Sequence, residues 1–167
     1  ASSSGVCIRF NESDARPMGR NTRGVRGIRL VEGHSVIGMI VVNDEARDIL
    51  TISANGYGKR TALEEYRLQS RGGKGIIAQK TTSKTGPIVS IKGVLEANDL
   101  MITTVGGIMI RMDIGSISKL GRNPQGVRVI KIREGDSIAD VTKVQIVEDL
   151  EENADGEEPA VDSVDSQ

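Results

Sequence analysis

The chain has few aromatic residues, one cysteine and no tryptophan. Its 167 residues include only Phe10, Tyr57 and Tyr66 as aromatics, which leaves little surface for stacking on single-stranded bases. As the only cysteine, Cys7 can form no disulfide within the chain. It lies in the apolar run Val6 to Ile8, and we predict that it is a small core residue. No apolar run approaches the roughly 18 residues of a membrane span, and the first four residues lack the pattern of a signal peptide. These absences favour a protein of the reducing cytoplasm.

A repeat of constant length runs through the chain. Arg9, Arg60 and Arg111 are separated by steps of 51 residues without a gap. Three further sets recur with the same step: Arg20, Arg71 and Arg122; Gly5, Gly56 and Gly107; and Gly24, Gly75 and Gly126. Repeats of this length built from short strands are typical of propeller blades, whereas helical repeats show long stripes with a period of 3.6.

One unit, from Asp48 to Ala97, contains four short apolar runs bounded by turn residues. The runs cover residues 49–52, 57–63, 75–78 and 87–91. Asn55-Gly56 favours a tight hairpin turn, because these residues tolerate positive φ angles, and Gly106-Gly107 occupies the equivalent place. Four strands make one blade, and neighbouring blades must pack together to bury their apolar faces. We predict an all-β, propeller-like fold with about three blades.

The predicted units lie near residues 1–45, 46–97 and 98–147. The strand that begins at Asp48 would have its first-unit equivalent before residue 1, which predicts that the chain starts inside a strand and belongs to a larger protein. From Glu148 onward the chain is too acidic and too poor in apolar residues to fold. We therefore predict a disordered acidic tail over residues 148–167.

The net charge of -1 conceals a strong asymmetry along the chain. Residues 1–147 hold all 22 Lys and Arg residues and 14 acidic residues, whereas residues 148–167 hold nine acidic residues and no base. A tail of this kind either competes with nucleic acid for the basic body or solubilises the terminus, and both interpretations stay open. In the body, the basic residues lie mainly beside glycines in turns.

Regularly spaced Lys and Arg can follow a phosphate backbone, and glycines allow main-chain N–H groups to approach phosphate oxygens. The alternative interpretation is a solvated charged surface. The chain offers no recognition helix and no zinc-ligand set, so we expect contact with the backbone of double-stranded DNA, with any preference arising from DNA bendability. The candidate DNA-binding residues are Arg9, Arg20, Arg23, Arg26, Lys59, Arg60, Arg67, Arg71, Lys74, Arg111, Lys119, Arg122 and Arg128.

The pattern predicts no catalytic residue, no metal site and no cofactor in this chain. His34, the only histidine, lies in a turn, and no Ser/His/Asp or Cys/His set can be assembled. Glu64-Glu65 is not reproduced in the other units, which favours a solvated strand end. The Gly-Gly-Lys-Gly segment lacks the Lys-Ser/Thr ending and the helix pattern of a phosphate loop.

Several longer segments together resemble a known family. They are Gly56 to Thr61, Glu65 to Gly75, Arg16 to Leu30 and Gly121 to Val127. Over residues 1 to about 147 the chain resembles the C-terminal domain of the A subunit of DNA gyrase, a type IIA topoisomerase. An acidic tail after the last blade is also similar to the family.

The resemblance implies a β-pinwheel, a ring of about six blades with strands exchanged between neighbours and double-stranded DNA wrapped around its basic rim. Wrapping in the family supports the negative supercoiling that ATP-driven strand passage introduces. The implied partners are the gyrase B subunit, together with the rest of the gyrase A subunit, in a complex of two copies of each, with ATP and Mg bound elsewhere. The family's cleaving tyrosine lies in a separate region, so neither Tyr57 nor Tyr66 is expected to be a nucleophile.

One motif departs from the family pattern. The family's first blade carries a Gln-Arg-Arg-Gly-Gly-Lys/Arg-Gly box, and the similar segment here consists of Gln69, Ser70, Arg71, Gly72, Gly73, Lys74 and Gly75. Because Ser70 replaces an arginine, we interpret this segment as a degenerate copy in a later blade. The alternatives are the corresponding domain of topoisomerase IV, in its A-type subunit, or a propeller that binds a protein partner; the regular units and acidic tail favour gyrase.

Overall fold

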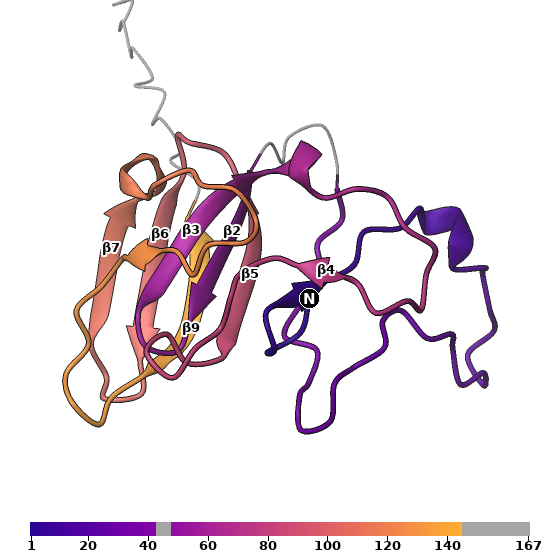
Figure 1. Ribbon diagram of the computed structural model, residues 1–167, viewed down its shortest axis with the longest axis horizontal. Helices are drawn as coiled ribbons and strands as arrows, with labels where there is room; N and C mark the ends of the chain where they lie inside the picture. The colour runs from indigo at the N-terminus through magenta and orange to yellow at the C-terminus, as the bar shows by residue number, and fades with distance from the viewer. Residues whose placement is uncertain (43–47, 145–167) are drawn as a thin grey trace, which may run out of the picture.

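The computed structural model describes residues 1–42 and 48–144, so the predicted acidic tail lies outside the described residues. This part of the chain consists of short strands, turns and three 3-10 helices, and it contains no α-helix. The 3-10 helices are η1 (Glu12–Asp14), η2 (Leu63–Glu65) and η3 (Ile114–Ser116). The predicted all-β class is confirmed (Figure 1).

No helix in the described part of the chain has the length and apolar character needed to cross a membrane.

Nine strands form three antiparallel sheets among the described residues. The strands are β1 (Val6–Cys7), β2 (Asp48–Ser53), β3 (Tyr57–Ala62), β4 (Ile76–Ile77), β5 (Ile88–Val94), β6 (Asp99–Thr104), β7 (Met109–Asp113), β8 (Val127–Arg128) and β9 (Ile138–Val144). The sheet orders are β5-β2-β3-β8, β7-β6-β9 and β1-β4. The repeat is visible in the fold, because β2, β3 and β5 recur about one period later as β6, β7 and β9.

Tight turns join the paired strands. Gly56, between β2 and β3, has a φ of 81°, and Gly107, between β6 and β7, has a φ of 83°. A side chain is strongly disfavoured at such angles, which explains why the repeat keeps glycine at this position. The Asn55-Gly56 and Gly106-Gly107 hairpins are therefore present, but only the second residue of each pair has the positive φ angle predicted for both.

Each short third strand leaves its own unit and pairs with the preceding one. In this way β4 of the second unit pairs with β1 of the first, and β8 of the third unit pairs with β3 of the second. Figure 1 shows β4 reaching across to the segment near the N-terminus. Strand exchange thus links the units through main-chain hydrogen bonds as well as through packed side chains.

Two apolar clusters form the core, and each spans two units. Leu50 and Ile52 of β2 pack with Leu100 and Ile102 of β6 and with Val141 of β9, and all five side chains are almost completely buried. Leu100 and Ile102 alternate with less buried residues along β6, whereas β2 is buried along its whole length and also places Ile49 in the second cluster. Cys7 joins Ile49, Tyr66 and Ala78 in the second cluster, so its predicted core position is confirmed.

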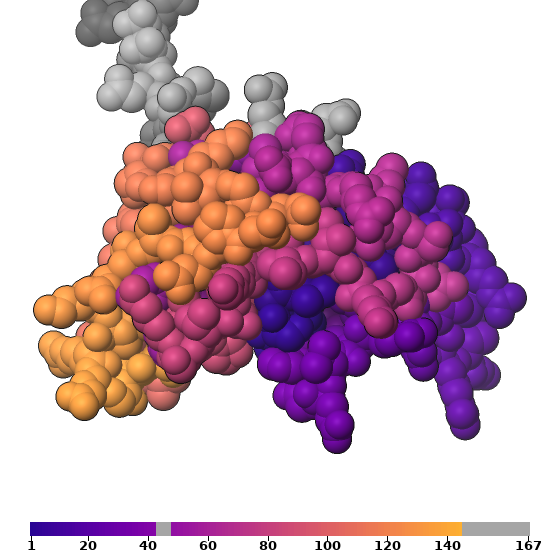
Figure 2. All heavy atoms as spheres, viewed as in Figure 1, coloured from indigo at the N-terminus to yellow at the C-terminus, as the bar shows by residue number. Residues whose placement is uncertain are grey.

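The first unit contains less regular structure than the other two. Ala1 and Ser3 reach Ile37 and Ser35 through main-chain hydrogen bonds, while most of residues 11–33 are exposed loop. Figure 2 shows this segment extending at one end of the molecule, away from the packed sheets. The basic stretch between Arg16 and Arg29 lies in this exposed loop.

Candidate nucleic-acid interface

The structure divides the predicted DNA-binding residues by exposure. Eight have exposed side chains: Arg20, Arg23, Arg26, Arg67, Lys74, Arg111, Lys119 and Arg128. Arg9, Arg71 and Arg122 are half-buried, whereas Lys59 and Arg60 are buried. The exposed group can meet a phosphate directly, whereas Lys59 and Arg60 could do so only after a rearrangement of the fold.

Arg60, one of the predicted DNA-binding residues, is buried and holds two units together. Its Nε donates to the main-chain oxygen of Ile117 at 2.8 Å, and its Nη2 donates to that of Gly115 at 3.1 Å. The same guanidinium lies 3.5 Å from the buried carboxylate of Asp48. Only 5% of the Arg60 surface is exposed. The side chain provides hydrogen-bond donors for main-chain carbonyls in η3 and directly after it, which would otherwise lack them.

Lys59, another predicted DNA-binding residue, is also buried between units. Its side chain is fully buried, and its Nζ donates to the main-chain oxygens of Gly121 and Arg122 in the third unit. Burial lowers the pKa of Lys59 to about 8, because removal from water disfavours the ammonium ion. The sequence pattern alone places Lys59 on the surface. Its long side chain instead carries the ammonium group to a buried contact between two units.

The contact made by Arg60 is itself repeated. Arg9, one period earlier, donates from Nη1 to the oxygens of Leu63 at 3.3 Å and Tyr66 at 3.1 Å in the second unit. Arg111, one period later, instead pairs with Asp99 at 2.6 Å, and 57% of its side chain is exposed. Where a following unit is present, this arginine position therefore joins a unit to the one that follows it.

A second arginine position joins each unit to the one before it. Arg71 donates from Nη1 to the main-chain oxygen of Arg26, and Arg122 donates to that of Ile77 at 2.9 Å. Arg71 Nε also donates to the oxygen of Asp14 at 2.9 Å. Arg20, the first member of the set, is exposed. Arg71 thus uses two of its nitrogens as donors within the protein and Arg122 uses one.

The repeated glycines after these arginines serve the contact between units. Gly75 and Gly126 have φ angles of 76° and 85°. A Cβ at Gly75 would lie 2.4 Å from the oxygen of Cys7, and one at Gly126 would lie 2.6 Å from the oxygen of Gly58. Both positions therefore require glycine so that the exchanged strand can approach its neighbour. This requirement does not depend on any contact between their N–H groups and phosphate.

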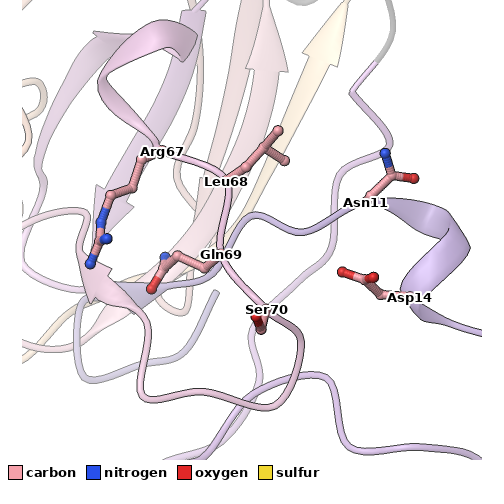
Figure 3. Close-up of a pocket in the computed structure, with 6 residues that line it drawn as sticks. All are labelled: Asn11, Asp14, Arg67, Leu68, Gln69 and Ser70. Carbon is pink, nitrogen blue, oxygen red and sulfur yellow. The ribbon is translucent and has the colours of Figure 1, made fainter.

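Gln69 and Ser70, the first two residues of the box-like segment, help to line an open depression of about 510 Å³. Figure 3 shows residues 67–70 on one side of the depression, with Asn11 and Asp14 on the other. Arg67 and Asp14 bring charges of opposite sign to this depression. Lys74 is exposed, whereas Arg71 is held by the first unit.

Sequence reasoning missed six exposed cations. They are Arg16, Arg29, Lys80, Lys84, Lys131 and Arg133. Arg16 and Arg29 lie within the basic loop of the first unit, so their sequence neighbours indicated them. The other four lie in the loops that follow β4 and β8. Lys80 and Lys131 stand one and two periods after Arg29, so the repeat itself marked this basic position. Lys84 and Arg133 have no basic equivalents in the other units, so the repeat gives no signal for them.

Both tyrosines are largely buried. Tyr66 is 3% exposed, and burial raises its pKa to about 12, which opposes formation of a nucleophilic phenolate. Tyr57 is 7% exposed, and its hydroxyl accepts a hydrogen bond from Arg128. In residues 1–42 and 48–144 no group of three or more His, Cys, Asp or Glu residues is arranged to hold a metal ion.

Comparison with known proteins gives one family match over nearly the whole described chain. The model of the DNA gyrase C-terminal domain, a β-propeller, matches residues 1–43, 47–94 and 98–145. The DNA gyrase A subunit of Staphylococcus epidermidis is 48% identical over 143 residues, which cover 85% of this chain and 16% of that protein. The corresponding protein of Staphylococcus aureus is 43% identical over 158 residues, covering 94% of this chain and 18% of that protein.

Solved structures show the same fold. A DNA gyrase A C-terminal domain superposes with a TM-score of 0.75 and 29% identity, covering 86% of this chain and 49% of that one. The C-terminal domain of a DNA topoisomerase IV gives a TM-score of 0.80 with 20% identity, covering 86% of this chain and 45% of that one. At 20% identity, the match with the topoisomerase IV domain shows a shared fold only.

Proposed function

Because this chain belongs to the family of DNA gyrase C-terminal β-propeller domains, we propose that it binds and bends double-stranded DNA within the gyrase A subunit. The proposal extends to wrapping DNA in support of ATP-dependent negative supercoiling. The chain spans only 16 to 18% of the length of the two staphylococcal proteins, so strand passage and ATP use are proposed for other parts of the complex.

The surface cations are the observation that carries this proposal. In the described part of the chain, only Arg60, Arg111 and Lys119 lie within 4 Å of a carboxylate oxygen. The other exposed Lys and Arg residues in that part have no ion-pair partner there. Cations without a carboxylate partner attract a polyanion, because phosphate contact releases the counterions condensed on DNA.

The proposal requires fewer cations than the sequence alone suggested. Lys59 and Arg60 are removed from the binding set by burial, and Arg9, Arg71 and Arg122 have donors engaged by neighbouring units. The exposed basic loop of the first unit and the exposed residues of the later units remain. The proposed partners are duplex DNA, the B subunit and the remainder of the A subunit. We propose that they meet in a whole gyrase in the bacterial cytoplasm.

A topoisomerase IV A-type subunit is the second candidate for the parent protein. The TM-score of 0.80 with a topoisomerase IV domain favours it at the level of fold. The staphylococcal identities of 43 and 48% instead favour gyrase. A protein-binding propeller is a third interpretation, in which the surface cations serve only to solvate the domain.

The salt dependence of binding to linear duplex DNA tests the proposal. The 167-residue chain is titrated with duplexes of increasing length at several salt concentrations. If about five phosphates are neutralised, the logarithm of the binding constant falls against log salt with a slope near -4 to -5. We expect affinity to increase with length until the curved surface is filled. A folded chain that binds no DNA at low salt contradicts the proposal.

A further inference from the structure

Tyr57 and Arg128 face each other across the exchanged strand pair. They are direct partners in the register of β3 with β8, which brings their side chains to the same face of the sheet. Arg128 Nη2 donates to the Tyr57 hydroxyl at 3.1 Å, and its guanidinium carbon lies 5.6 Å from the centre of the ring. The junction of the second and third units thus holds a cation beside a phenol.

A second cation reaches the same ring from another loop. Lys84 Nζ lies 5.3 Å from the centre of the Tyr57 ring. The hairpin that precedes Tyr57 fixes this loop, because Asn55 Nδ2 donates to the main-chain oxygen of Lys84 at 3.0 Å and Asn55 N donates to that of Thr85 at 3.0 Å. Lys84 is therefore held in place by its backbone while its side chain remains exposed.

No carboxylate balances these two cations in the described part of the chain. Lys84 and Arg128 are both exposed, and neither lies within 4 Å of an acidic oxygen there. The hydrogen bond from Arg128, together with the nearby charge of Lys84, lowers the pKa of Tyr57. Two like charges directed at one hydroxyl repel each other, and an anion placed between them relieves the repulsion.

The arrangement does not follow from the repeat. One period away from Lys84 the chain has Gly33 and Gly135, and one period after Tyr57 it has Ile108. The packing of a unit therefore needs neither the lysine nor the tyrosine at these positions. A feature that only one junction possesses is more readily explained by a ligand than by the fold.

We propose that Lys84, Arg128 and the Tyr57 hydroxyl together form a seat for one backbone phosphate of double-stranded DNA. Ammonium, guanidinium and phenol groups all donate hydrogen bonds, which matches the acceptor oxygens of a phosphodiester. The identity of this ligand rests on the proposed function, because the anion is assigned to DNA. The seat fixes the position of the duplex at the second junction without reading its bases.

Titration of the tyrosines tests the seat in the absence of DNA. The chain has two tyrosines, with pKa values displaced in opposite directions, so their ultraviolet or NMR transitions separate, and Tyr57→Phe identifies the first. Inorganic phosphate added at constant ionic strength is expected to raise the pKa of Tyr57, because a bound anion opposes phenolate formation. The pKa of Tyr66 is expected to stay unchanged.

Matched variants separate the seat from a general loss of charge. Lys84→Gln combined with Arg128→Gln is expected to abolish the phosphate response, and Lys84→Gln alone weakens it without altering the exchanged strand. Lys80→Gln removes one exposed cation from the same loop and should leave the response intact. An unchanged Tyr57 pKa in the presence of phosphate overturns the proposal.

DNA binding supplies the second readout. Loss of one phosphate contact reduces the magnitude of the salt slope by about 0.9. Because both cations address one phosphate, the double variant should lose about this amount, whereas two independent contacts would cost about twice as much. A double variant with the salt slope of the parent overturns the seat even if the chain binds DNA well.

The two proposals fail in different ways. If the chain binds no DNA while phosphate still raises the Tyr57 pKa, the anion seat stands and the proposed function fails. If DNA binding is strong while phosphate has no effect on Tyr57 and the double variant binds normally, the proposed function stands and the seat fails.

Discussion

At the scale of single residues, one sequence position serves different purposes in different units. Arg9 and Arg60 donate to carbonyls of the following unit, and Arg111 lies exposed in an ion pair with Asp99. The three arginines have the same spacing and similar sequence neighbours. Arg9 and Arg60 have the following unit packed against them, whereas no segment among the described residues covers Arg111 in this way.

Replacement of Arg60 is expected to destabilise the fold strongly. Arg60→Ala leaves the buried Asp48 carboxylate without its arginine partner and removes donors from η3 carbonyls. Because Lys119 Nζ also lies 2.7 Å from the Asp48 carboxylate, that charge keeps one partner. We expect a loss of about 2–3 kcal/mol of unfolding free energy, mainly from buried carbonyls left without donors. Arg111→Ala is the control, since an exposed ion pair contributes less than about 1 kcal/mol. Equal losses in urea denaturation of the two variants would contradict the assignment of Arg60.

The buried Cys7 thiol should make stability depend on alkaline pH. Burial raises the pKa of Cys7 from its ordinary value of 9.0 to about 11. A group whose pKa is raised in the folded state contributes stability that is complete below pH 9 and is lost as the pH rises through 11. The stability difference between the parent and Cys7→Ala should therefore shrink over this range.

Denaturant unfolding of both proteins at pH 8, 9, 10 and 11 checks this. Comparison with Cys7→Ala is essential, because Lys59 and Tyr66 titrate in overlapping ranges. The lowered pKa of Lys59 increases stability between pH 8 and 10.5, whereas the raised pKa of Tyr66 decreases it between pH 10 and 12. A difference that does not change with pH would show that the thiol is not protected from ionisation.

At the scale of elements, the exchanged strands make each unit depend on its neighbours. β4 and β8 contain two residues each and pair with strands of the preceding unit. Strands this short gain little from their own hydrogen bonds, so they rely on the close approach that Gly75 and Gly126 permit. The exchanged strand therefore depends on the glycine turn that precedes it.

Three Gly→Ala variants test whether the exchanged strand depends on its glycine turn. Gly24→Ala places a Cβ at a φ of 74° in open space, and Gly126→Ala places one at 85° against the oxygen of Gly58. We expect the first to cost about 1–2 kcal/mol from backbone strain alone. The second should cost clearly more, because the new Cβ also separates β8 from β3. Gly121→Ala, whose Cβ would meet no neighbour within 4 Å, is the near-neutral control.

Thermal unfolding of the three variants measures these differences. Equal melting temperatures for Gly24→Ala and Gly126→Ala would mean that strand exchange contributes little to the stability of the domain. A loss confined to Gly126→Ala would instead show that the approach of β8 to β3 matters more than the backbone angle.

At the scale of the whole molecule, charge is segregated along the chain. All 22 basic residues precede residue 148, and nine acidic residues follow without a base. The structure does not describe the acidic segment, so its effect is argued from charge. A tethered polyanion competes with DNA for exposed cations, and salt screens both interactions.

Deletion of residues 148–167 is therefore expected to strengthen DNA binding. The affinity gain should be largest at low salt and should decrease as salt screens the tail. Fluorescence anisotropy with a labelled duplex, for the parent and the truncated chain, measures the change. A variant with the nine tail acids replaced by Asn or Gln keeps the length and serves as the control for chain removal. Weaker binding after truncation would contradict competition by the tail.

The sequence by itself determined the period and, in the second and third units, the strand positions and the hairpin turns; the described part of the first unit contains only the strand β1. These features depend on local chemistry: the 51-residue step, the short apolar runs and the Asn-Gly and Gly-Gly turns specify conformation within a few residues. The family resemblance was likewise readable, because it rests on contiguous segments. Cys7 was correctly assigned to the core from its apolar neighbours.

Only the tertiary structure decided which charges face solvent. Lys59 and Arg60 look like exposed strand residues, yet packing of the third unit buries them against its main-chain carbonyls. Lys84 and Arg128 lie 44 residues apart in the chain and meet only because β8 is exchanged onto β3. The exposure of a long side chain depends on contacts between distant segments, and a repeat pattern carries no information about which neighbour will cover it.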